Sequence, residues 1–332
     1  MTFASIIMPA FNVEATMAAT LNALLAQTYP AFEIIIVDDG SSDDTARIAA
    51  EFARDRRVRV IRQGNRGLAG ARNSGIAAAR GDIIGFCDAD DIWLPHKLAR
   101  HVAHLMANPH VGVSYAGSAL MNDAGVLIGQ AQRPRLENIC ASTIFKRNPI
   151  GNGSAAVMRR AVLEEISYRP QSEPARDWYF DETFRQSEDI ECWLRIALTT
   201  SWVFEGIPGL LTHYRITAGG LSAATERQLA AWERMVTKLT PLNPAFFTVN
   251  APIARAYQLR YLCRRAVSDL DGAKALMWQR AWLAESRMTL VEEPVKSIVT
   301  LVASLGLSMV GTHGVRQAMK GVQLLRHRKA VR

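Results

Sequence analysis

Acidic side chains follow two apolar runs in the N-terminal third of the chain, at the point where each run ends. Asp38-Asp39 comes after a β-branched run, and Asp88-Ala89-Asp90 comes directly after a second apolar run. Paired carboxylates in this position suit Mg²⁺ or Mn²⁺ held together with the oxygens of a bound diphosphate. The alternative is a solvated turn, or acids that stabilise the start of the next helix through its dipole. For Asp88-Ala89-Asp90, the strand-like run before it and the second acidic pair at a neighbouring strand end favour the metal and diphosphate interpretation. For Asp38-Asp39, the functional interpretation is that one of them accepts hydrogen bonds from a nucleobase or ribose.

Two further segments carry residue types suited to the same chemistry. Glu188-Asp189 opens a predicted helix, where a carboxylate could take the proton of an acceptor hydroxyl as a general base. The alternative role of this pair is to stabilise the helix dipole. Arg72 lies in the Gly-rich segment 67–75 and is a candidate diphosphate contact. Because that segment matches neither GxGxxG nor a P-loop, dinucleotide and ATP chemistry of those types is disfavoured.

The elements that must position these residues alternate between strand and helix patterns up to residue 120. Apolar runs predict strands, and apolar residues at helical spacing predict helices between them. The predicted strands cover 5–8, 32–37, 58–62 and 83–87, and the predicted helices cover 14–27, 42–55 and 68–79. This order predicts an α/β fold with a mostly parallel sheet and helices on both faces. Ligands of such sheets bind beyond the carboxyl ends of the strands, which is where the acidic pairs fall.

The pattern changes after residue 120. The further elements expected are a hairpin over 121–130, a polar stretch over 133–149, a helix over 189–198, a strand over 203–211, and helices near 223–239, 251–268 and 272–289. Asn152-Gly153-Ser154 is a loop of small residues that we place on the acceptor side. His96, His101 and His104 share one predicted helix, where a solvated face is the preferred interpretation over a metal site.

Composition restricts the class of protein. With 332 residues, 49% of them apolar and 21% charged, the chain can bury a large core and is not expected to be disordered. The four cysteines lie far apart and form no CxxC pair, which argues against a disulfide framework or structural zinc site. The N-terminal segment lacks the basic region of a signal peptide, so a cytoplasmic location is expected.

The net charge of +8 comes from one end of the chain. Seven of the 39 basic residues and none of the 31 acidic ones lie between Pro294 and Arg332, so the remainder is close to neutral. A nucleic-acid partner is not expected, because basic residues are not spread over a folded face. The apolar stretch 297–311 is shorter than the roughly 20 residues of a spanning helix. Two interpretations stay open: peripheral contact with an anionic membrane, or a packed helix with a basic tail.

Several motifs in a fixed order resemble those of the family 2 glycosyltransferases. The resemblance is carried by segments 5–45 and 65–98 and continues through GNGSAAVMRRAVL, SEDIECWLRIA and HYRITAGGLS, thus over about residues 3 to 222. It implies the GT-A fold and transfer of a sugar from a nucleotide diphosphate sugar with inversion at the anomeric carbon. The family often has a His soon after the Tyr-Arg pair, where this chain has Thr217; His213 lies nearby.

The resemblance also implies roles for individual residues. The implied nucleotide-sugar site consists of Pro9, Phe11, Asp39, Arg72, Asp88, Ala89 and Asp90. In that site Phe11 would stack on the base and Asp39 would accept a hydrogen bond from it. Asp88 would face the ribose, and Asp90, with Asp88 beside it, would hold the divalent cation, either Mn²⁺ or Mg²⁺. Asp189 would be the general base.

The resulting hypothesis is a metal-assisted, inverting glycosyltransferase, with a UDP-sugar as the favoured donor. It would act in cell-surface polysaccharide or glycoconjugate synthesis on a saccharide or lipid-linked glycan, in the cytoplasm or at the inner face of the plasma membrane. Residues 1–222 would form the GT-A domain, with a nucleotide-sugar half (1–120) and an acceptor half (121–222), and 223–332 a helical extension with a basic tail. The alternatives are a sugar-nucleotide nucleotidylyltransferase, which the lack of a Lys-bearing Gly-rich loop disfavours, and a non-catalytic scaffold.

Overall fold

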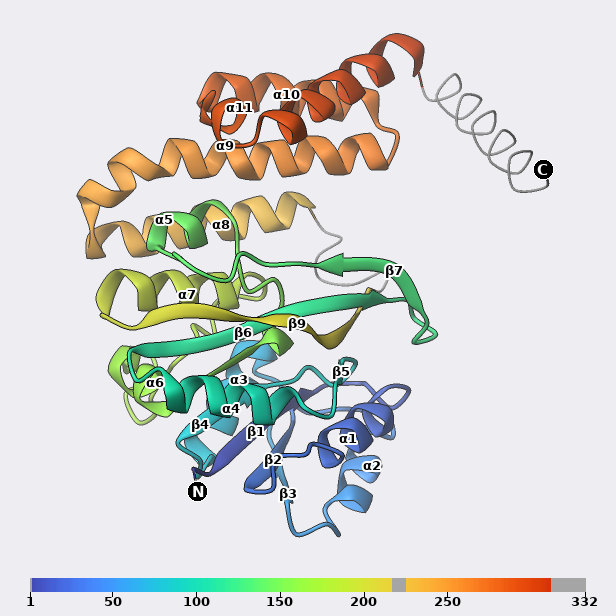
Figure 1. The fold of residues 1–332 in the computed structure, drawn as a ribbon, viewed down its shortest axis with the longest axis vertical. Coiled ribbons are helices and arrows are strands. Elements are labelled where there is room, and N and C mark those ends of the chain that lie inside the picture. The colour runs from blue at the N-terminus through green and yellow to red at the C-terminus, as the bar shows by residue number, and fades with distance from the viewer. Residues whose placement is uncertain (1, 217–224, 312–332) are drawn as a thin grey trace, which may run out of the picture. The chain divides into compact units, whose positions relative to one another are not determined.

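The structure is a computed structural model, which describes residues 2–216 and 225–311 (Figure 1). The chain separates into two compact units. Unit 1 comprises Met1–Ile144 and Asn148–Ala224, and unit 2 comprises Phe145–Arg147 and Thr225–Arg332. The domain boundary expected at residue 222 lies outside the described residues.

Unit 1 is built on one mixed sheet. Its strands, in the order in which they pair, are β3 (Val58–Arg62), β2 (Phe32–Asp38), β1 (Ala4–Ala10), β4 (Ile83–Phe86), β8 (Ala156–Arg159), β6 (Val111–Met121), β9 (Val203–Arg215) and β5 (Ile92–Trp93), with β7 (Leu127–Gln132) on β6. The first four strands along the chain are mutually parallel, which confirms the predicted parallel half. The second half is mixed, because β8 runs antiparallel to β4 and β6, whereas β6 and β9 are parallel.

Helices flank this sheet as the alternating pattern predicts. The helices of unit 1 are α1 (Met17–Leu25), α2 (Thr45–Phe52), α3 (Gly67–Ala78), α4 (Lys97–Ala107), α5 (Ala141–Lys146, ending in the segment grouped with unit 2), α6 (Arg160–Ile166) and α7 (Glu188–Thr199). The helices and strands predicted up to residue 87 are confirmed, with helix bounds one to three residues shorter at most ends. The hairpin is confirmed as β6–β7, but β6 begins ten residues before it, at Val111, and that part of the strand was not predicted.

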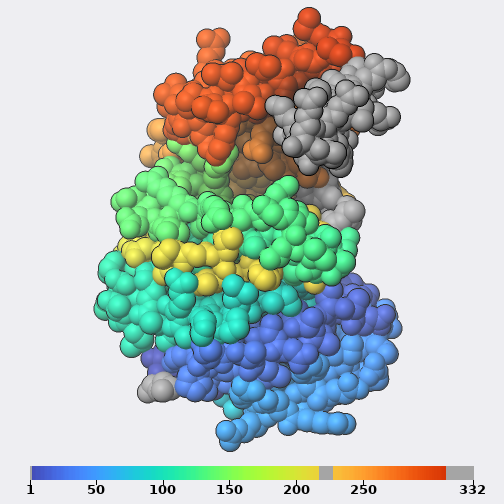
Figure 2. Space-filling view, turned by 45° about the vertical axis from the view of Figure 1, so that its right-hand side comes forward, coloured from blue at the N-terminus to red at the C-terminus, as the bar shows by residue number. Residues whose placement is uncertain are grey.

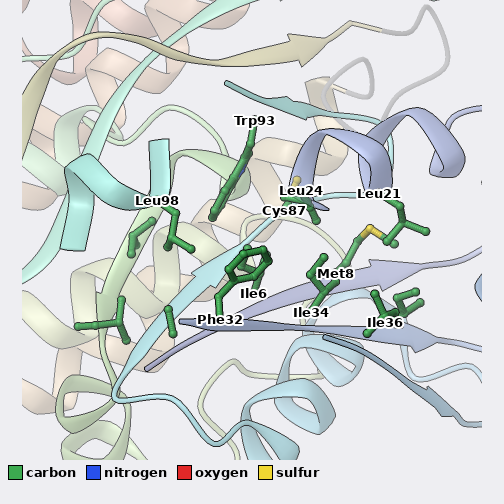
Figure 3. Close-up of a cluster of buried hydrophobic side chains, with 14 of the residues drawn as sticks. Ile6, Met8, Leu21, Leu24, Phe32, Ile34, Ile36, Cys87, Trp93 and Leu98 are labelled. Atoms are coloured by element: carbon green, nitrogen blue, oxygen red, sulfur yellow. The ribbon is translucent and has the colours of Figure 1, made fainter. Parts of the chain in front are cut away.

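The core of unit 1 lies between the parallel strands and α1 and α4. Every residue of β1 and β2 is buried, as their nearly continuous apolar sequences require. Figure 3 shows the side chains on one face of the sheet, where Ile6, Met8, Ile34 and Ile36 pack beneath Leu21 and Leu24 of α1 and Leu98 of α4. The backbone of β1, β2 and β4 is therefore held rigidly up to the strand ends where the acidic pairs lie.

The prediction that the three histidines of α4 face solvent is wrong for His101 and His104. His101 is fully buried, and its Nδ1 lies 2.7 Å from the hydroxyl of Ser114 on β6. His104 meets the same hydroxyl at 2.9 Å and Glu205 of β9 at 2.9 Å. His96 stays exposed at the start of α4. The helix therefore uses imidazoles, rather than only aliphatic groups, to pack on the sheet.

Unit 2 is helical in the residues that the structure describes. It contains α8 (Thr225–Leu239), α9 (Pro244–Ser268), α10 (Gly272–Glu285), α11 (Met288–Glu292) and a further helix over Pro294–Gly311. The predicted helical segments are confirmed, although α9 begins seven residues earlier than expected. Buried Trp282 packs with Leu259 and Leu262 of α9, and Trp232 stacks on Phe145 at 5.3 Å between ring centroids. Aromatic packing thus holds this unit together.

The helix over Pro294–Gly311 is longer than the 15-residue apolar stretch seen in the sequence. Its 18 residues meet the length and composition of a membrane span, and only 22% of them are buried. By themselves these properties are weak evidence, because core helices of soluble proteins can share them. Six of the seven basic residues of the C-terminal region follow residue 311 and lie outside the described residues.

Candidate active site

The carboxyl ends of β1, β2 and β4 meet at one edge of the sheet. Parallel register pairs Ala10 with Asp38, and Ile7 with Phe86, so the segments that follow these strands lie at a common edge. Both acidic pairs seen in the sequence belong to this edge. The structure gives them different surroundings, however.

Asp38 and Asp39 are held by hydrogen-bond donors of the protein. Asp39 Oδ1 accepts from the Arg66 amide at 2.9 Å and from Gln63 Nε2 at 2.7 Å, and its Oδ2 accepts from the Gly67 amide at 2.8 Å. The amides belong to the start of α3, so Asp39 satisfies N–H groups that a helix start leaves free. Asp38 Oδ1 likewise accepts from the Ser41 amide at 2.9 Å. The capping interpretation therefore holds for Asp39, which caps α3 rather than the next helix along the chain, whereas Asp38 stabilises the turn that precedes α2.

The segment after β4 crowds three carboxylates together. Asp90 has its pKa raised to about 6 by burial and by the nearby charge of Asp88. Burial and the charges of Asp88 and Asp90 raise the pKa of Asp91 well above its usual value. The Arg215 amide donates to Asp91 at 3.0 Å, and Arg215 Nε donates to the Asp90 carbonyl at 2.9 Å. This segment therefore holds more negative charge than its own donors offset.

Arg72 connects this acidic segment with α7. Its guanidinium is 2% exposed and donates to Asp88 at 3.0 Å and to Glu188 at 2.7 Å. It also lies 5.5 Å and 5.9 Å from the ring centroids of Phe180 and Phe86. Burial raises the pKa of Glu188 to about 7, although the positive charge of Arg72 opposes that effect. The sequence predicted that Arg72 contacts the diphosphate. In the structure its guanidinium donates instead to the carboxylates of Asp88 and Glu188.

Asp189 is the neighbour of Glu188 and differs from it in exposure. Glu188 is buried against Arg72, whereas Asp189 is partly exposed. Ser187 before them has a left-handed φ of 62°, which fixes how the chain enters α7. Asp189 Oδ1 accepts from the Ile190 amide at 2.8 Å, and its Oδ2 accepts from Asn148 Nδ2 at 3.3 Å. Burial raises the pKa of Asp189 and Arg72 lowers it, so a carboxylate able to accept a proton lies beside the acidic segment.

The loop Asn152-Gly153-Ser154 lies against the segment Asp88–Asp90 and makes a hydrogen bond with it. Ser154 Oγ accepts from the Asp88 amide at 2.9 Å, and the Ser154 carbonyl accepts from Lys97 Nζ at 2.8 Å. A Cβ on Gly153 would lie 2.3 Å from an Arg72 guanidinium nitrogen, so only glycine fits there. Asn152 is buried and donates to Ser118 at 2.9 Å. Sequence reasoning missed these contacts, although the run of small residues was a signal of close approach.

The other residues of the predicted site occupy distinct positions. Phe11 is 49% exposed at the end of β1, and the next residue, Asn12, is held in a left-handed conformation with its side chain accepting from the Ser42 amide. Pro9 is buried in β1 beside Val37 of β2. Ala89 is 3% exposed and its carbonyl accepts from the hydroxyls of Thr16 and Thr20. The aromatic ring of Phe11 is therefore the part of this group that is open to solvent.

Two residues near the end of β9 were left open by the sequence. His213 pairs with Ile92 of β5 and is partly buried, which lowers its pKa. Thr217 lies outside the described residues. Among residues 2–216 and 225–311, no three His, Cys, Asp or Glu side chains form a group that could by itself hold a metal ion.

The arrangement of the sheet matches that of sugar-transferring enzymes of known structure. Staphylococcus aureus TarS, residues 1–349 in complex with UDP-GlcNAc, superposes with a TM-score of 0.56 at 16% identity, over 96% of this chain and 92% of that one. The mannosyltransferase PcManGT from Pyrobaculum calidifontis, in complex with GDP-Man and Mn²⁺, gives 0.54 at 20% identity, over 93% and 87%. At these identities the likeness concerns the fold, which is that of the GT-A glycosyltransferases.

Sequence comparison gives the family. The model described as "Glycosyl transferase family 2" matches residues 5–167. The Escherichia coli UDP-Glc:alpha-D-GlcNAc-diphosphoundecaprenol beta-1,3-glucosyltransferase WfaP is 31% identical over 69% of this chain and 83% of its own length. The enzyme of the same description named WfgD is 28% identical over 77% and 90%. An uncharacterized glycosyltransferase of Nostoc is 35% identical, but this match spans only about half of each protein. The chain belongs to glycosyltransferase family 2 and is a glycosyltransferase enzyme.

Proposed function

We propose that the enzyme transfers a glucosyl or related unit from a UDP-sugar to the hydroxyl of a lipid-linked sugar diphosphate, in one displacement with inversion. The observation that carries this proposal is the fixed link Asp88–Arg72–Glu188, which places Asp189 beside the Asp88–Asp90 segment. The substrate class rests on two E. coli relatives whose names give a UDP-Glc donor and a GlcNAc-diphosphoundecaprenol acceptor.

The Asp88–Asp90 segment fits a divalent cation. It offers carboxylate oxygens, which Mg²⁺ and Mn²⁺ prefer. Burial and the negative charge of Asp88 raise the pKa of Asp90 to about 6, and a bound cation would offset that charge. Asp90 and Asp88 would hold the metal together with the donor diphosphate. Such a cation, when bound, would offset the charge that gathers on the departing nucleoside diphosphate.

Asp189 is the proposed general base. The acceptor oxygen attacks C1 of the donor sugar, the bond from C1 to the diphosphate oxygen breaks, and the acceptor proton passes to Asp189. The Asn148 amide and the Ile190 N–H orient the Asp189 carboxylate for this transfer. One base and no separate nucleophile correspond to a single displacement, which inverts the configuration at C1.

The nucleoside part of the donor is proposed to lie at the ends of β1 and β2. The exposed ring of Phe11 offers a stacking surface on a turn held by side-chain hydrogen bonds. A carboxylate has about four acceptor positions, and Asp39 uses three of them within the protein. The fourth is proposed to accept a base N–H. Arg72 is proposed to act by positioning Asp88 and Glu188 rather than by direct contact with the diphosphate.

Calorimetric titration with UDP, GDP, CDP and dTDP, each with and without Mn²⁺, tests the donor site. We expect metal-dependent binding of UDP that is lost in Asp90→Ala. Turnover is then measured with UDP-glucose and a synthetic GlcNAc-diphospho-lipid, and Asp189→Asn should bind UDP normally without transferring sugar. UDP binding without turnover of any UDP-sugar would favour the scaffold alternative, and an inorganic-pyrophosphate-dependent reaction would favour the nucleotidylyltransferase.

A further inference from the structure

The helix over Pro294–Gly311 of unit 2 has its polar side buried and its apolar side exposed. Ser297, Thr300 and Ser304 are at most 3% exposed. The opposite side carries seven large apolar side chains, each 43–85% exposed: Val295, Ile298, Val299, Val302, Leu305, Met309 and Val310. A surface helix of a water-soluble domain normally shows the reverse arrangement. The seven exposed side chains are called the apolar stripe below.

The polar side is fixed in place by specific hydrogen bonds within unit 2. Ser297 Oγ donates to the Thr289 carbonyl at 2.7 Å and accepts from Arg260 at 2.5 Å. Ser304 Oγ donates to Gln279 of α10. Arg260 and Gln279 are themselves buried. Turning the helix to bury its apolar stripe would break all of these contacts, so the stripe has to face outward.

The apolar stripe is continuous along the helix. Its members recur at spacings of three and four residues, which places them on one face. Val291 of α11, three residues before this helix, is also exposed, at 71%. Figure 2 shows the red surface to which this helix contributes, open to solvent in that view. Large contiguous apolar patches on soluble proteins mark sites of interaction with a partner or a membrane.

Charge indicates which partner fits. The region from Pro294 to Arg332 has seven basic residues and no acidic one. An anionic lipid surface offers both an apolar layer for the stripe and negative headgroups for the basic residues. A second copy of the chain would instead bring two basic segments together, which their repulsion disfavours.

We propose that the apolar stripe docks on the surface of an anionic lipid bilayer, with the helix lying in the plane of the interface. At about 1.5 Å per residue the 18-residue helix could almost cross the hydrocarbon core. Its polar side is bonded to α9, α10 and α11, however, so it enters a membrane from one face only. Docking of this kind would hold the enzyme at a membrane surface that could carry the proposed lipid-linked acceptor, but binding itself does not require catalysis.

Flotation with lipid vesicles tests this proposal on the full chain without donor or acceptor. The vesicles contain phosphatidylcholine alone or mixed with phosphatidylglycerol. We expect binding to the mixed vesicles that weakens as salt is raised, because the Debye length shortens. The variant V299D/V302D should lower the partition coefficient at least tenfold. The control V249D, on α9, places one carboxylate, half of the charge added by V299D/V302D, at a position of matched exposure (66%, against 65% for Val302) and should stay within twofold of the unmodified chain.

Three results would overturn the proposal. These are unchanged binding of V299D/V302D, absence of binding to phosphatidylglycerol vesicles, and a dimer in solution that V299D/V302D dissociates. Thermal melting checks that the variants fold, and I298S/V302S tests the same face with smaller polar side chains if the charged pair lowers the melting temperature. Because no turnover is measured, failure of the proposed transferase reaction would leave this result standing.

Discussion

Two groups of acids at one edge of the sheet have opposite surroundings. Asp38 and Asp39, the hydrogen-bonded acids, accept from backbone amides, and Asp39 accepts also from the Gln63 side chain. Asp88, Asp90, Asp91, Glu188 and Asp189, the crowded acids, gather around Arg72 and Arg215. Burial and mutual repulsion raise the pKa values of four of the crowded acids: Asp90, Asp91, Glu188 and Asp189.

The difference separates acids that the protein's own hydrogen-bond donors stabilise from acids that crowd one another. A carboxylate that accepts hydrogen bonds from the protein's own donors stabilises the fold as an anion. A carboxylate kept near others of the same charge costs stability unless a cation or a proton arrives. Unfavourable charge of this kind is typical of active sites. Substitutions that neutralise one acid from each group should therefore have effects of opposite sign on stability.

The largest expected effect is on catalysis by Asp189. Asp189→Asn removes the proposed proton acceptor but keeps the shape of the side chain, and kcat should fall about 10²–10⁴-fold. Stability should be unchanged or slightly higher, because burial already disfavours the charged form. Steady-state kinetics with the UDP-sugar identified by calorimetry measures the effect. Asp44→Asn, at an exposed surface carboxylate, is the control, and equal activity of the two variants would contradict the assignment.

Gly153→Ala tests whether Arg72 holds the crowded acids in place. The added Cβ would lie 2.3 Å from the buried guanidinium, which is bonded to two carboxylates and has little room to move. We expect kcat/KM to fall by up to about 10²-fold and the free energy of unfolding by about 1–3 kcal/mol. Gly64→Ala is the matched control, because a Cβ there meets nothing within 4 Å. Equal kinetics of the two alanine variants would show that Arg72 is not a positioning residue.

Two stability measurements test the difference between the hydrogen-bonded acids and the crowded acids, with one substitution in each group. Asp39→Asn puts an amide where backbone N–H donors point, and the free energy of unfolding should fall by about 2–3 kcal/mol. Asp90→Asn removes a charge whose pKa is raised to about 6, so without metal the protein at pH 7 should gain about 1–2 kcal/mol. Urea denaturation of EDTA-treated protein measures both. Added Mn²⁺ should stabilise the unmodified chain but not Asp90→Asn, and destabilisation by both substitutions in EDTA would break the distinction.

The sequence predicts where the acids lie but not which group each belongs to. Apolar runs and helical spacing predicted β1 to β4 and α1 to α3, hence the edge at which the acids meet. The partners come from distant positions: Arg72 and Glu188 are 116 residues apart, and the donors to Asp39 come from the start of another helix. No local pattern shows such contacts. The same limit applies to the helix over 294–311, whose apolar content is visible in the sequence but whose buried side is not.

The buried histidine of α4 should make stability depend on pH, with a smaller effect than the loss expected in Asp39→Asn. Burial and the charges of Lys97, His104 and Arg100 hold the pKa of His101 well below its usual value, while Ser114 of β6 meets its Nδ1. In the unfolded chain this imidazole takes up a proton near pH 6.5, but in the folded protein it stays neutral. The unfolded state therefore binds more protons below pH 6.5, and stability falls as pH falls. Between pH 6.5 and 5 the loss should reach about 1.6 kcal/mol, measured by urea denaturation. His101→Gln should remove this part of the pH dependence, whereas His96→Gln, at an exposed position, should keep it. Equal slopes for both variants would show that His101 takes up its proton in the folded protein as readily as in the unfolded chain.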